Sequence, residues 1–443
     1  MVSQSLELLR AEIADMGRLR TIGRVMSVGA GTVEVAGLSS RAALGDRTMI
    51  RCQNGRDIGA EVLALRPDRV TLLPDGAADG IAINDAVDLL GQAGIAPDDS
   101  WVGRIVDPFG APLDGRALMR GKVERPLRAP PPPAAQRRRL GQRLETGVAV
   151  FNTLLPIVRG QRIGLFAGSG VGKSTLLAQL AKGIAADVVV IALIGERGRE
   201  LREFVENTLG PEGMQRAVII AATSDQSPLI RRRCAWAAMA VAEHFRDRGD
   251  HVLFLADSVT RFAEAHREVA LAGGEAPSLR GFPPSTSHMI MALAERSGPG
   301  HQGSGDITAV FSVLVAGSDM EEPVADILRG VLDGHVVLDR AIAERGRYPA
   351  IDLLRSVSRS LPDAATGAEN NLIAQARRLL GSYDRAELMI QAGLYAAGSD
   401  PMIDAAIRVW PALDSFLSDP EPAGIANSFK RLENVLSRAK PPT

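Results

Sequence analysis

The strongest structural signal in this chain reads Ile163-Gly164-Leu165-Phe166-Ala167-Gly168-Ser169-Gly170-Val171-Gly172-Lys173-Ser174-Thr175. It starts with a short apolar run, continues through a glycine-rich loop and leads into the helical pattern of Leu176–Ala181. This order predicts a buried strand, a tight loop and a helix. Glycines let successive backbone N–H groups turn toward phosphate oxygens, and the start of a helix adds partial positive charge. We therefore predict a phosphate-binding P-loop, also called a Walker A motif.

The residues of this loop have distinct expected roles. Lys173 should reach the β- and γ-phosphates of a nucleotide, and the Ser174 hydroxyl should bind Mg²⁺. Ala167 stands where the usual motif begins with glycine. The alternative is a glycine turn without a ligand, but the strand before the loop and the helix after it favour phosphate binding. The predicted phosphate-binding residues are Gly168, Ser169, Gly170, Val171, Gly172, Lys173, Ser174 and Thr175.

Further apolar runs follow the loop, each separated from the next by a helical segment. Strands and helices that alternate in this way predict a parallel sheet with helices on both faces, the core of an α/β fold. The predicted strands are Arg162–Phe166, Val188–Ile194, Ala217–Ala221, His251–Leu255 and Thr308–Leu314.

Two acidic residues follow predicted strands of this sheet. Asp257 comes directly after Val252–Ala256, where a carboxylate can hold Mg²⁺ through its water shell, although a helix N-cap is the alternative. Glu196 follows Val188–Ile194 closely, where a carboxylate can orient or deprotonate an attacking water. The pattern alone leaves the role of Glu196 open, because its neighbours also fit a surface ion-pair cluster: Arg197, Arg199 and Glu200.

The segments on either side of the sheet differ from it in character. Short β-type runs between Thr21 and Leu90 predict a small barrel or sandwich. The β signal fades after Asp363, and helical patterns then predict a mostly helical domain. The predicted barrel runs are Arg24–Val28, Gly31–Val35, Arg47–Cys52, Asp57–Leu65 and Arg69–Leu73, and the predicted C-terminal helices are Asn371–Gly381, Arg385–Gly393, Pro401–Val409 and Ala426–Arg438.

Two connecting segments complete the domain organisation. Met1–Met16 carries one apolar stripe of a short helix, which either packs on its own domain or docks on a partner or membrane surface. The prolines Pro130–Pro133 predict an extended connection, and the arginines Arg137–Arg139 after it are interpreted as a solvated face rather than a nucleic-acid site. The predicted domains are an N-terminal helix (1–18), a β-barrel domain (19–95), a P-loop domain (96–360) and a C-terminal helical domain (361–443).

Length, charge and cysteine content limit the possible classes. The 443 residues are too many for one ordinary core, and 51 basic against 52 acidic residues give no global pull toward nucleic acid. Cys52 and Cys234 provide neither a disulfide framework nor a zinc-binding spacing. The longest apolar run noted here, Val188–Ile194, is far shorter than the ~20 residues of a membrane-spanning helix, and Met1–Gly17 does not resemble a secretory signal. We expect a cytosolic protein that reaches a membrane only by docking.

Further motifs, taken together with the P-loop, resemble the type III protein-export ATPases, which are relatives of the catalytic subunits of rotary F- and V-type ATP synthases. The resemblance extends from about Gly23 to Asp404. Alanine at the position of Ala167 is similar to the export branch, whereas the synthase subunit usually has glycine there. The motifs are Gly195-Glu196-Arg197-Gly198-Arg199-Glu200, Thr223-Ser224-Asp225-Gln226-Ser227-Pro228, Asp257-Ser258-Val259-Thr260-Arg261, and Tyr348-Pro349-Ala350-Ile351-Asp352 with Ser356-Val357-Ser358-Arg359.

The resemblance implies a small N-terminal β-barrel, a central RecA-like P-loop ATPase domain with a parallel sheet, and a C-terminal helical domain. It also implies the roles of single residues. Glu196 would be the general base, Arg197 would stand near the γ-phosphate, and Lys173 would contact the phosphates. Ser174 and Asp257 would hold Mg²⁺, Asp257 through water. Arg359 would be an arginine finger inserted into the neighbouring subunit's site, and Tyr348 and Tyr395 would stack the adenine unless they are ordinary core aromatics.

The function implied by the resemblance is ATP hydrolysis, with Mg²⁺, coupled to protein export through a flagellar type III apparatus. The implied assembly is a homohexamer whose activity depends on assembly. The implied partners are a central stalk protein, a regulatory stator-type protein, export-gate membrane proteins, and export chaperones with their substrates, but no nucleic acid. The implied location is the cytoplasm, peripheral at the cytoplasmic face of the export apparatus.

Four alternatives stay open at this point. An injectisome ATPase would differ in the system it serves, and a catalytic subunit of a rotary ATP synthase is disfavoured by Ala167 and the Thr223–Pro228 motif. An RNA translocase would need aromatic residues on its nucleic-acid-binding barrel, yet Thr21–Leu90 contains no Phe, Trp or Tyr. A nucleotide-binding scaffold without turnover would have lost its base or its finger, but Glu196 and Arg359 are both present.

Overall fold

The structure is a computed structural model that describes residues 20–29, 31–315 and 320–439. The predicted N-terminal helix at 1–18 therefore lies outside the described residues. Contacts divide the chain into two compact units, one with the residues before Gly94 and one with the rest, apart from two short segments, Ser227–Leu229 and Glu268–Ala276. The domain boundaries placed at residues 18, 95 and 360 stay predictions, because a compact unit need not be a domain that folds alone.

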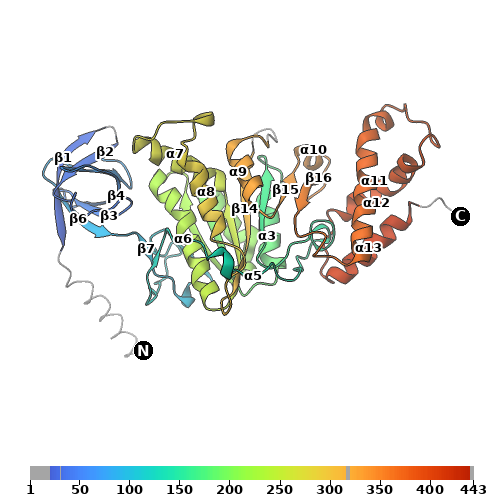
Figure 1. The fold of residues 1–443 in the computed structure, drawn as a ribbon, viewed down its shortest axis with the longest axis horizontal. Helices are drawn as coiled ribbons and strands as arrows, with labels where there is room; N and C mark the ends of the chain where they lie inside the picture. The colour runs from blue at the N-terminus through green and yellow to red at the C-terminus, as the bar shows by residue number, and fades with distance from the viewer. Residues whose placement is uncertain (1–19, 30, 316–319, 440–443) are drawn as a thin grey trace. The chain divides into compact units, whose positions relative to one another are not determined.

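The first unit contains a closed barrel of six antiparallel strands in the order β1-β2-β5-β4-β3-β6 (Figure 1). The predicted barrel is thus confirmed. Its strands alternate in burial, as in β2, where Val33 and Val35 are fully buried and Glu34 between them is not. Five strands overlap the predicted runs and β6 is additional: β1 Thr21–Gly29, β2 Thr32–Ala36, β3 Arg47–Arg51, β4 Asp57–Leu65, β5 Val70–Pro74 and β6 Ala86–Gly91.

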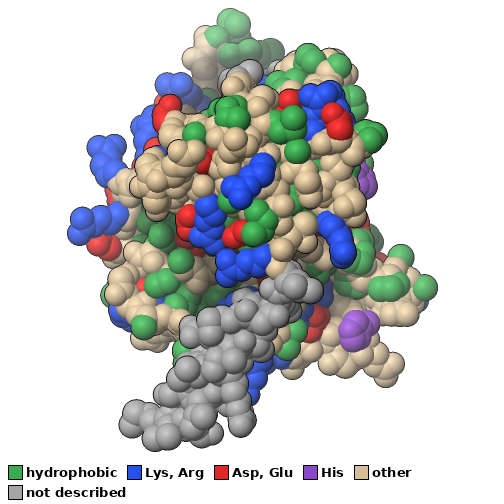
Figure 2. Space-filling model, turned by 90° about the vertical axis from the view of Figure 1, so that its left-hand side faces the viewer, with side chains coloured by type: hydrophobic (Ala, Val, Ile, Leu, Met, Phe, Trp, Pro, Cys, Tyr) green, Lys and Arg blue, Asp and Glu red, His purple; other side chains and the backbone are tan. Residues whose placement is uncertain are grey.

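The charged side chains of the barrel are largely paired with one another. Arg51 lies 3.1 Å from Asp88 and also contacts Asp57, and Arg69 lies 3.2 Å from Glu34. Basic and acidic side chains accordingly lie side by side on the face drawn in Figure 2, with hydrophobic side chains between them.

The second unit is built on an eight-stranded sheet in the order β16-β15-β10-β14-β13-β11-β12-β8. All neighbours are parallel except β15 and β16, so β16 is an antiparallel edge strand. Residues Val188–Gly195 are all buried, as expected for a strand covered on both faces. The five predicted strands are confirmed as β10 Arg162–Ala167, β11 Val188–Glu196, β12 Ala217–Thr223, β13 His251–Asp257 and β14 Asp306–Leu314. Three further strands were missed: β8 Arg104–Val106, β15 Gly334–Leu338 and β16 Ile351–Ser358.

Helices connect the strands and flank the sheet (Figure 1). Among the residues that the structure describes, none of the helices combines the length and the apolar character that crossing a bilayer requires. The helices are α2 Ala149–Asn152, α3 Lys173–Gly183, α4 Gly198–Glu203, α5 Gly210–Met214, α6 Pro228–Asp247, α7 Val259–Ala272, α8 Ser285–Glu295, α9 Pro323–Val331 and α10 Arg340–Glu344. Shorter elements are the strands β7 Gly94–Ile95 and β9 Arg125–Pro126, the 3₁₀ turns η1 Asp99–Trp101, η2 Ala134–Gln136 and η4 Leu279–Gly281, and the π-helical turn η3 Phe204–Leu209.

Three helices form the C-terminal part: α11 Gly367–Gln391, α12 Pro401–Phe416 and α13 Ile425–Ser437. The separate helices predicted at Asn371–Gly381 and Arg385–Gly393 were wrong, because they form the single helix α11. Ser382 and Ala386 lie on the same buried stripe as Leu379, so packing outweighs the weak helix preference of Gly381. The apolar faces of these helices join α3 and one face of the sheet in one hydrophobic core.

The proline tract is followed by arginines, of which one is bound into the fold. Arg137 donates to the carbonyls of Pro132 (3.1 Å) and Ser297 (3.3 Å), and its side chain is 14% exposed. Arg138 forms an ion pair with Asp306 at 2.7 Å but stays exposed. The interpretation of Arg137–Arg139 as a solvated face was therefore wrong for Arg137. The partners of both arginines are carbonyls and a carboxylate from distant segments, which the sequence pattern does not reveal.

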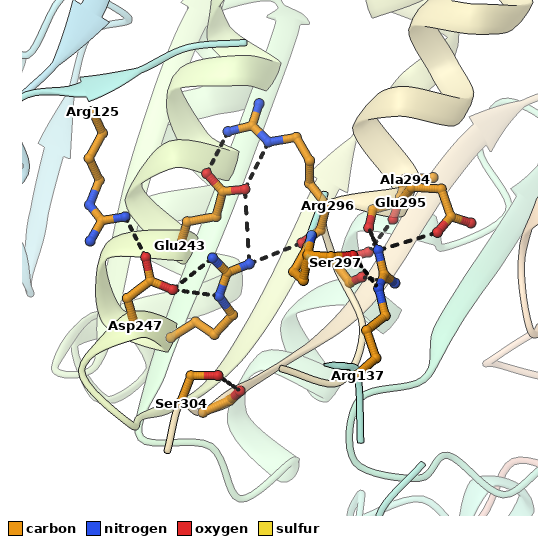
Figure 3. A network of polar contacts seen from close by, with 12 residues as sticks. Arg125, Arg137, Glu243, Asp247, Ala294, Glu295, Arg296, Ser297 and Ser304 are labelled. Carbon is orange, nitrogen blue, oxygen red and sulfur yellow. Dashed lines mark hydrogen bonds and ion pairs between the residues drawn. The ribbon is translucent and has the colours of Figure 1, made fainter. Parts of the chain in front are cut away.

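A buried ion pair stands at the centre of this network (Figure 3). Arg296 donates two hydrogen bonds to the carboxylate of Glu243, at 2.9 and 2.6 Å, and a third at 2.5 Å to the carbonyl of Leu127. Both charged side chains are at least 95% buried. The pair therefore fastens the segment that precedes the proline tract to helix α6 and to the residue after α8.

We expect Glu243→Gln to lower the melting temperature, because loss of one partner leaves the buried Arg296 charge uncompensated, at a cost of about 3 kcal/mol. Thermal unfolding followed by circular dichroism measures this. The matched control is Glu206→Gln, which removes one partner of the exposed Arg202 pair at 2.8 Å and should change stability by about 0.5 kcal/mol or less. Equal effects of the two substitutions would contradict the prediction.

Candidate active site

The strand order brings the predicted site residues to one edge of the sheet. The P-loop follows β10, Asp257 ends β13 and Glu196 ends β11, and these strands are parallel. Only β14 separates β10 from β13, so their carboxyl ends lie about 10 Å apart. Parallel strands point their carboxyl ends in the same direction, and ligands of α/β sheets bind there.

The P-loop connects β10 to α3 through a left-handed residue. Gly172 has a φ of +85° and directly precedes α3, so its conformation favours glycine. A Cβ atom at Gly172 would also lie only 3.1 Å from the ring of Tyr348. Tyr348 therefore stands against the phosphate loop with about half of its surface exposed, which leaves room for a ring to stack on it.

The Lys173 ammonium contacts the Asp257 carboxylate directly. The side chain of Asp257 is 4% exposed and that of Lys173 is 11% exposed. The same carboxylate oxygen accepts a hydrogen bond of 2.8 Å from the hydroxyl of Ser312, which lies on β14 between the two strands. The P-loop lysine and the strand-end acid are thus held together in a largely dry environment.

A bulge at the end of β11 orients Glu196. The register between β11 and β12 shifts between Ile194 and Glu196, and Gly195 in the bulge has a φ of +69°. A bulge of this kind turns the following side chain away from the direction that a regular strand would give it. A Cβ atom at Gly195 would lie at ordinary contact distances, 3.4 Å from Arg231 and 3.5 Å from Arg261, so the positive φ rather than lack of space favours glycine here.

The environment of Glu196 favours its neutral form. Burial, and then the negative charge of Asp257, raise the pKa of Glu196 to about 7. The cations of Lys173 and Arg261 act in the opposite direction, and a hydrogen bond with Glu200 raises the pKa further. A carboxylate with a pKa near neutrality can accept a proton from water and release it again at physiological pH.

Two residues of this site were not assigned a role from the sequence. Arg261 lies close enough to Glu196 to influence its charge, and its Nε is buried without a hydrogen-bond partner among the described residues. The signal was a basic residue four positions after Asp257. Ser312 interrupts the apolar run Ala309–Leu314 of β14, and a polar residue inside such a run was a visible signal as well.

Three predicted site residues lie apart from this cluster. Arg197 is exposed and lies 3.5 Å from Glu200. Tyr395 lies between α11 and α12, and its hydroxyl lies 3.0 Å from both the carboxylate of Asp404 and the carbonyl of Asp400, which can accept its single proton. Arg359 is exposed directly after β16 and donates to the carbonyl of Arg329 at 3.1 Å. The roles assigned to these three side chains stay predictions.

The oxygen atoms at this edge fit a magnesium–nucleotide complex. Ser174 is exposed at the start of α3, and Asp257 supplies a carboxylate on the adjacent side. Within residues 20–29, 31–315 and 320–439, no cluster of three His, Cys, Asp or Glu side chains could bind a metal alone. One hydroxyl and one carboxylate match the usual way in which proteins bind Mg²⁺, with one or two protein oxygens together with substrate phosphates and water. The arrangement defines a P-loop nucleotide hydrolase.

Comparison with known proteins agrees with this class. The nucleotide-binding domain of the ATP synthase alpha/beta family matches residues 147–358, and the T3SS EscN ATPase C-terminal domain matches residues 365–434. The flagellum-specific ATP synthase of Caulobacter vibrioides is 45% identical over 437 residues, covering 97% of this chain and 98% of that protein. The type 3 secretion system ATPase of Xanthomonas euvesicatoria is 41% identical over 435 residues, covering 97% of this chain and 98% of that protein.

A solved structure shows the same fold. It is the assembled ATPase EscN in complex with its central stalk EscO, from the type III secretion system of enteropathogenic E. coli. The TM-score is 0.85 at 36% identity, over 94% of this chain and 100% of that chain. The chain belongs to the ATP synthase alpha/beta family and is an ATPase of its type III secretion branch. The match of the C-terminal helices distinguishes it from the rotary synthase subunits.

We expect the acid limb of the pH profile of kcat/KM to report Glu196. Its carboxylate must be unprotonated to accept a proton, so activity should fall as the pH drops through about 7. Glu200→Ala removes a hydrogen bond that raises this pKa and should move the limb to lower pH. Glu196→Gln should retain ATP binding and abolish turnover. An acid limb that is unchanged in Glu200→Ala would contradict this account.

We expect Ser312→Ala to reduce kcat by roughly ten- to a hundredfold, because a hydrogen bond to a charged group contributes about 1.5–3 kcal/mol. The Mg²⁺ concentration needed for half-maximal activity should rise, since Asp257 loses its orientation. Ser312→Thr keeps the hydroxyl and should keep most of the activity. An unchanged Mg²⁺ dependence in the alanine variant would mean that the hydroxyl only fills space.

Proposed function

We propose that this ATPase powers protein export through a flagellar type III secretion apparatus. The observation that carries the proposal is a P-loop site with Lys173, Asp257 and Glu196 together, in a chain 45% identical to a flagellum-specific ATP synthase over nearly its whole length. The type 3 secretion system ATPase of Xanthomonas is 41% identical over a similar length, so an injectisome is the second choice.

In the proposed reaction, Lys173 and the loop N–H groups bind the phosphates of ATP, and Tyr348 stacks on the adenine. Glu196 accepts the proton of the attacking water. Arg261, next to Glu196, stabilises negative charge on the transferred phosphoryl group. Ser174 and Asp257 would hold Mg²⁺, which neutralises phosphate charge when bound. Arg197 and Tyr395 are proposed contacts of the γ-phosphate and the adenine, which require their side chains to turn toward the nucleotide.

Arg359 is proposed to act on the site of a neighbouring subunit. Tyr348 lies beside the P-loop of its own chain and precedes β16, whereas Arg359 follows this eight-residue strand. A strand of that length separates the two residues by roughly 23 Å. Arg359 is also exposed, as a residue that contacts another subunit must be before assembly. The geometry supports a finger in trans, and so does the assembled state of the relative EscN.

The proposed assembly is a homohexamer with one site at each interface. A ring in which each subunit donates a residue to the next has head-to-tail contacts that close on themselves. By similarity to EscN, a central stalk protein is a proposed partner. A stator-type regulator, export-gate membrane proteins and export chaperones with their substrates are further proposed partners. The proposed location is the cytoplasmic face of the export apparatus, reached by docking, and Mg²⁺ is the proposed metal.

We expect activity to be restored when two inactive variants are mixed. Glu196→Gln lacks the base but keeps the finger, whereas Arg359→Ala keeps the base and lacks the finger. In randomly mixed rings about a quarter of the interfaces combine an intact base with an intact finger. ATPase activity should therefore recover to about that fraction, although each variant alone should be at least ~10³-fold slower than the parent. No recovery in verified mixed rings would contradict a finger in trans.

The export function is tested in a strain that lacks this gene and is complemented with the parent or with Glu196→Gln. We expect the parent to restore secretion of flagellar subunits into the medium and the variant to fail at equal expression. The matched control is Glu206→Gln, an exposed position outside the site, which should restore secretion. Secretion that is normal without the gene would overturn the proposal, whatever the ATPase activity.

A further inference from the structure

A cavity in the second compact unit shares no lining residue with the nucleotide site. Its volume is about 540 Å³, and it is lined by α10 and the residues after it, the start of β16, and the second halves of α11 and α12. These elements are labelled together in Figure 1. The lining residues span 78 positions of the sequence, from Asp339 to Leu417. A volume of this size accommodates several side chains of a ligand.

An aromatic pair forms one wall of this cavity. The rings of Tyr383 and Trp410 stack at 4.2 Å with an interplanar angle of 11°. The guanidinium of Arg345 already lies 5.7 Å from the centre of the Trp410 ring. Aromatic faces attract cations and the aliphatic stems that carry them. This wall therefore suits a basic side chain.

Acidic groups dominate the lining. Six carboxyl groups and two guanidinium groups line the cavity, and both guanidinium groups have acidic partners, Arg345 with Glu387 at 3.3 Å and Arg347 with Asp414 at 3.1 Å. Two more lining acids are paired with arginines outside the lining, Asp339 with Arg355 at 3.5 Å and Glu344 with Arg340 at 2.8 Å, so two carboxylates remain in excess. The excess of negative charge disfavours phosphates and acidic peptides. The six carboxyl groups belong to Asp339, Glu344, Asp352, Asp384, Glu387 and Asp414.

A buried hydrogen-bond donor without an acceptor places a second requirement on the ligand, in addition to its positive charge. The side chain of Arg347 is 8% exposed, and its Nη2 donates to the carbonyl of Ile351 at 2.8 Å. Its Nη1 is buried and has no hydrogen-bond partner in the part of the chain that the structure describes. A buried donor of this kind is unfavourable until an acceptor pairs with it. A neutral carbonyl satisfies it without bringing negative charge to the acidic lining.

We propose that this cavity binds a basic peptide segment of a partner protein. The arginine or lysine side chain of the segment lies along Tyr383 and Trp410 and pairs with the carboxylates of α11, while a backbone carbonyl accepts from Arg347. A peptide carries both groups, whereas a polyamine carries the cations without the carbonyl. The site is separate from the proposed export reaction and requires no ATP.

Trp410 provides a direct readout for this proposal, because the other two tryptophans, Trp101 and Trp236, are buried. The full-length protein is titrated with a capped hexapeptide of alternating glycine and arginine. The signal is the fluorescence change of the parent minus that of Trp410→Phe. We expect a saturable change with this peptide, a weaker one with spermine, and none with the glycine–glutamate peptide or inorganic phosphate.

Matched variants locate the binding. Asp384→Asn with Glu387→Gln should weaken binding of the arginine peptide at least tenfold. Asp363→Asn with Glu433→Gln removes the same charge from exposed positions outside the cavity and should leave binding unchanged. Arg347→Met should weaken the peptide, which loses its carbonyl partner, whereas spermine should bind at least as tightly, because a positive charge is removed from the lining. An unchanged melting temperature verifies the fold of this variant.

The proposal is overturned if no saturable Trp410 signal appears, or if the two charge variants weaken binding equally. It is also overturned if phosphate or the acidic peptide binds instead. If Arg347→Met does not fold, the comparison of the two charge variants still decides the question, since all four positions are outside the buried core.

Discussion

A buried pair of opposite charges determines how this molecule can be arranged around its nucleotide site. Lys173 and Asp257 are removed from water together, and removal of either would leave the other uncompensated at a cost of about 3–5 kcal/mol. The register of strands β10, β14 and β13 must therefore keep Lys173 and Asp257 within hydrogen-bonding distance of each other. The register of these strands consequently places the P-loop lysine beside the strand-end acid.

The same pair explains how a ligand can reorganise the site with small movements. In the proposed reaction, the phosphates take over Lys173, and the released oxygen of Asp257 becomes available to the water shell of Mg²⁺. Ser312 donates to that oxygen in the present arrangement and so limits the directions in which the carboxylate can turn. Both partners affect the pKa of Glu196, because the charge of Asp257 raises it and the charge of Lys173 lowers it.

Much of this could be predicted from the sequence, for identifiable reasons. Fully buried strands such as β11 are continuous apolar runs, and a glycine loop between strand and helix is unmistakable, so Lys173, Asp257 and Glu196 could be located. Helix α11 was divided in two because a local pattern at Gly381 does not include the packing that overrides it. The partners of Arg137 could not be found, since they are carbonyls of distant segments. The distance between Tyr348 and Arg359 depends on the direction of β16, which only the sheet topology provides.

The edge strand β16 has a consequence for communication around the proposed ring. Tyr348, which lies beside the P-loop of its own chain, precedes this strand, and Arg359, which is proposed to act in the neighbouring subunit, follows it. A β-strand is stiff along its length and β16 is hydrogen-bonded to β15, so a shift at one end is carried to the other. Nucleotide bound at one site would thus shift the arginine finger at the adjacent site and change its rate of hydrolysis. The six sites of the proposed ring would then hydrolyse ATP in sequence rather than independently.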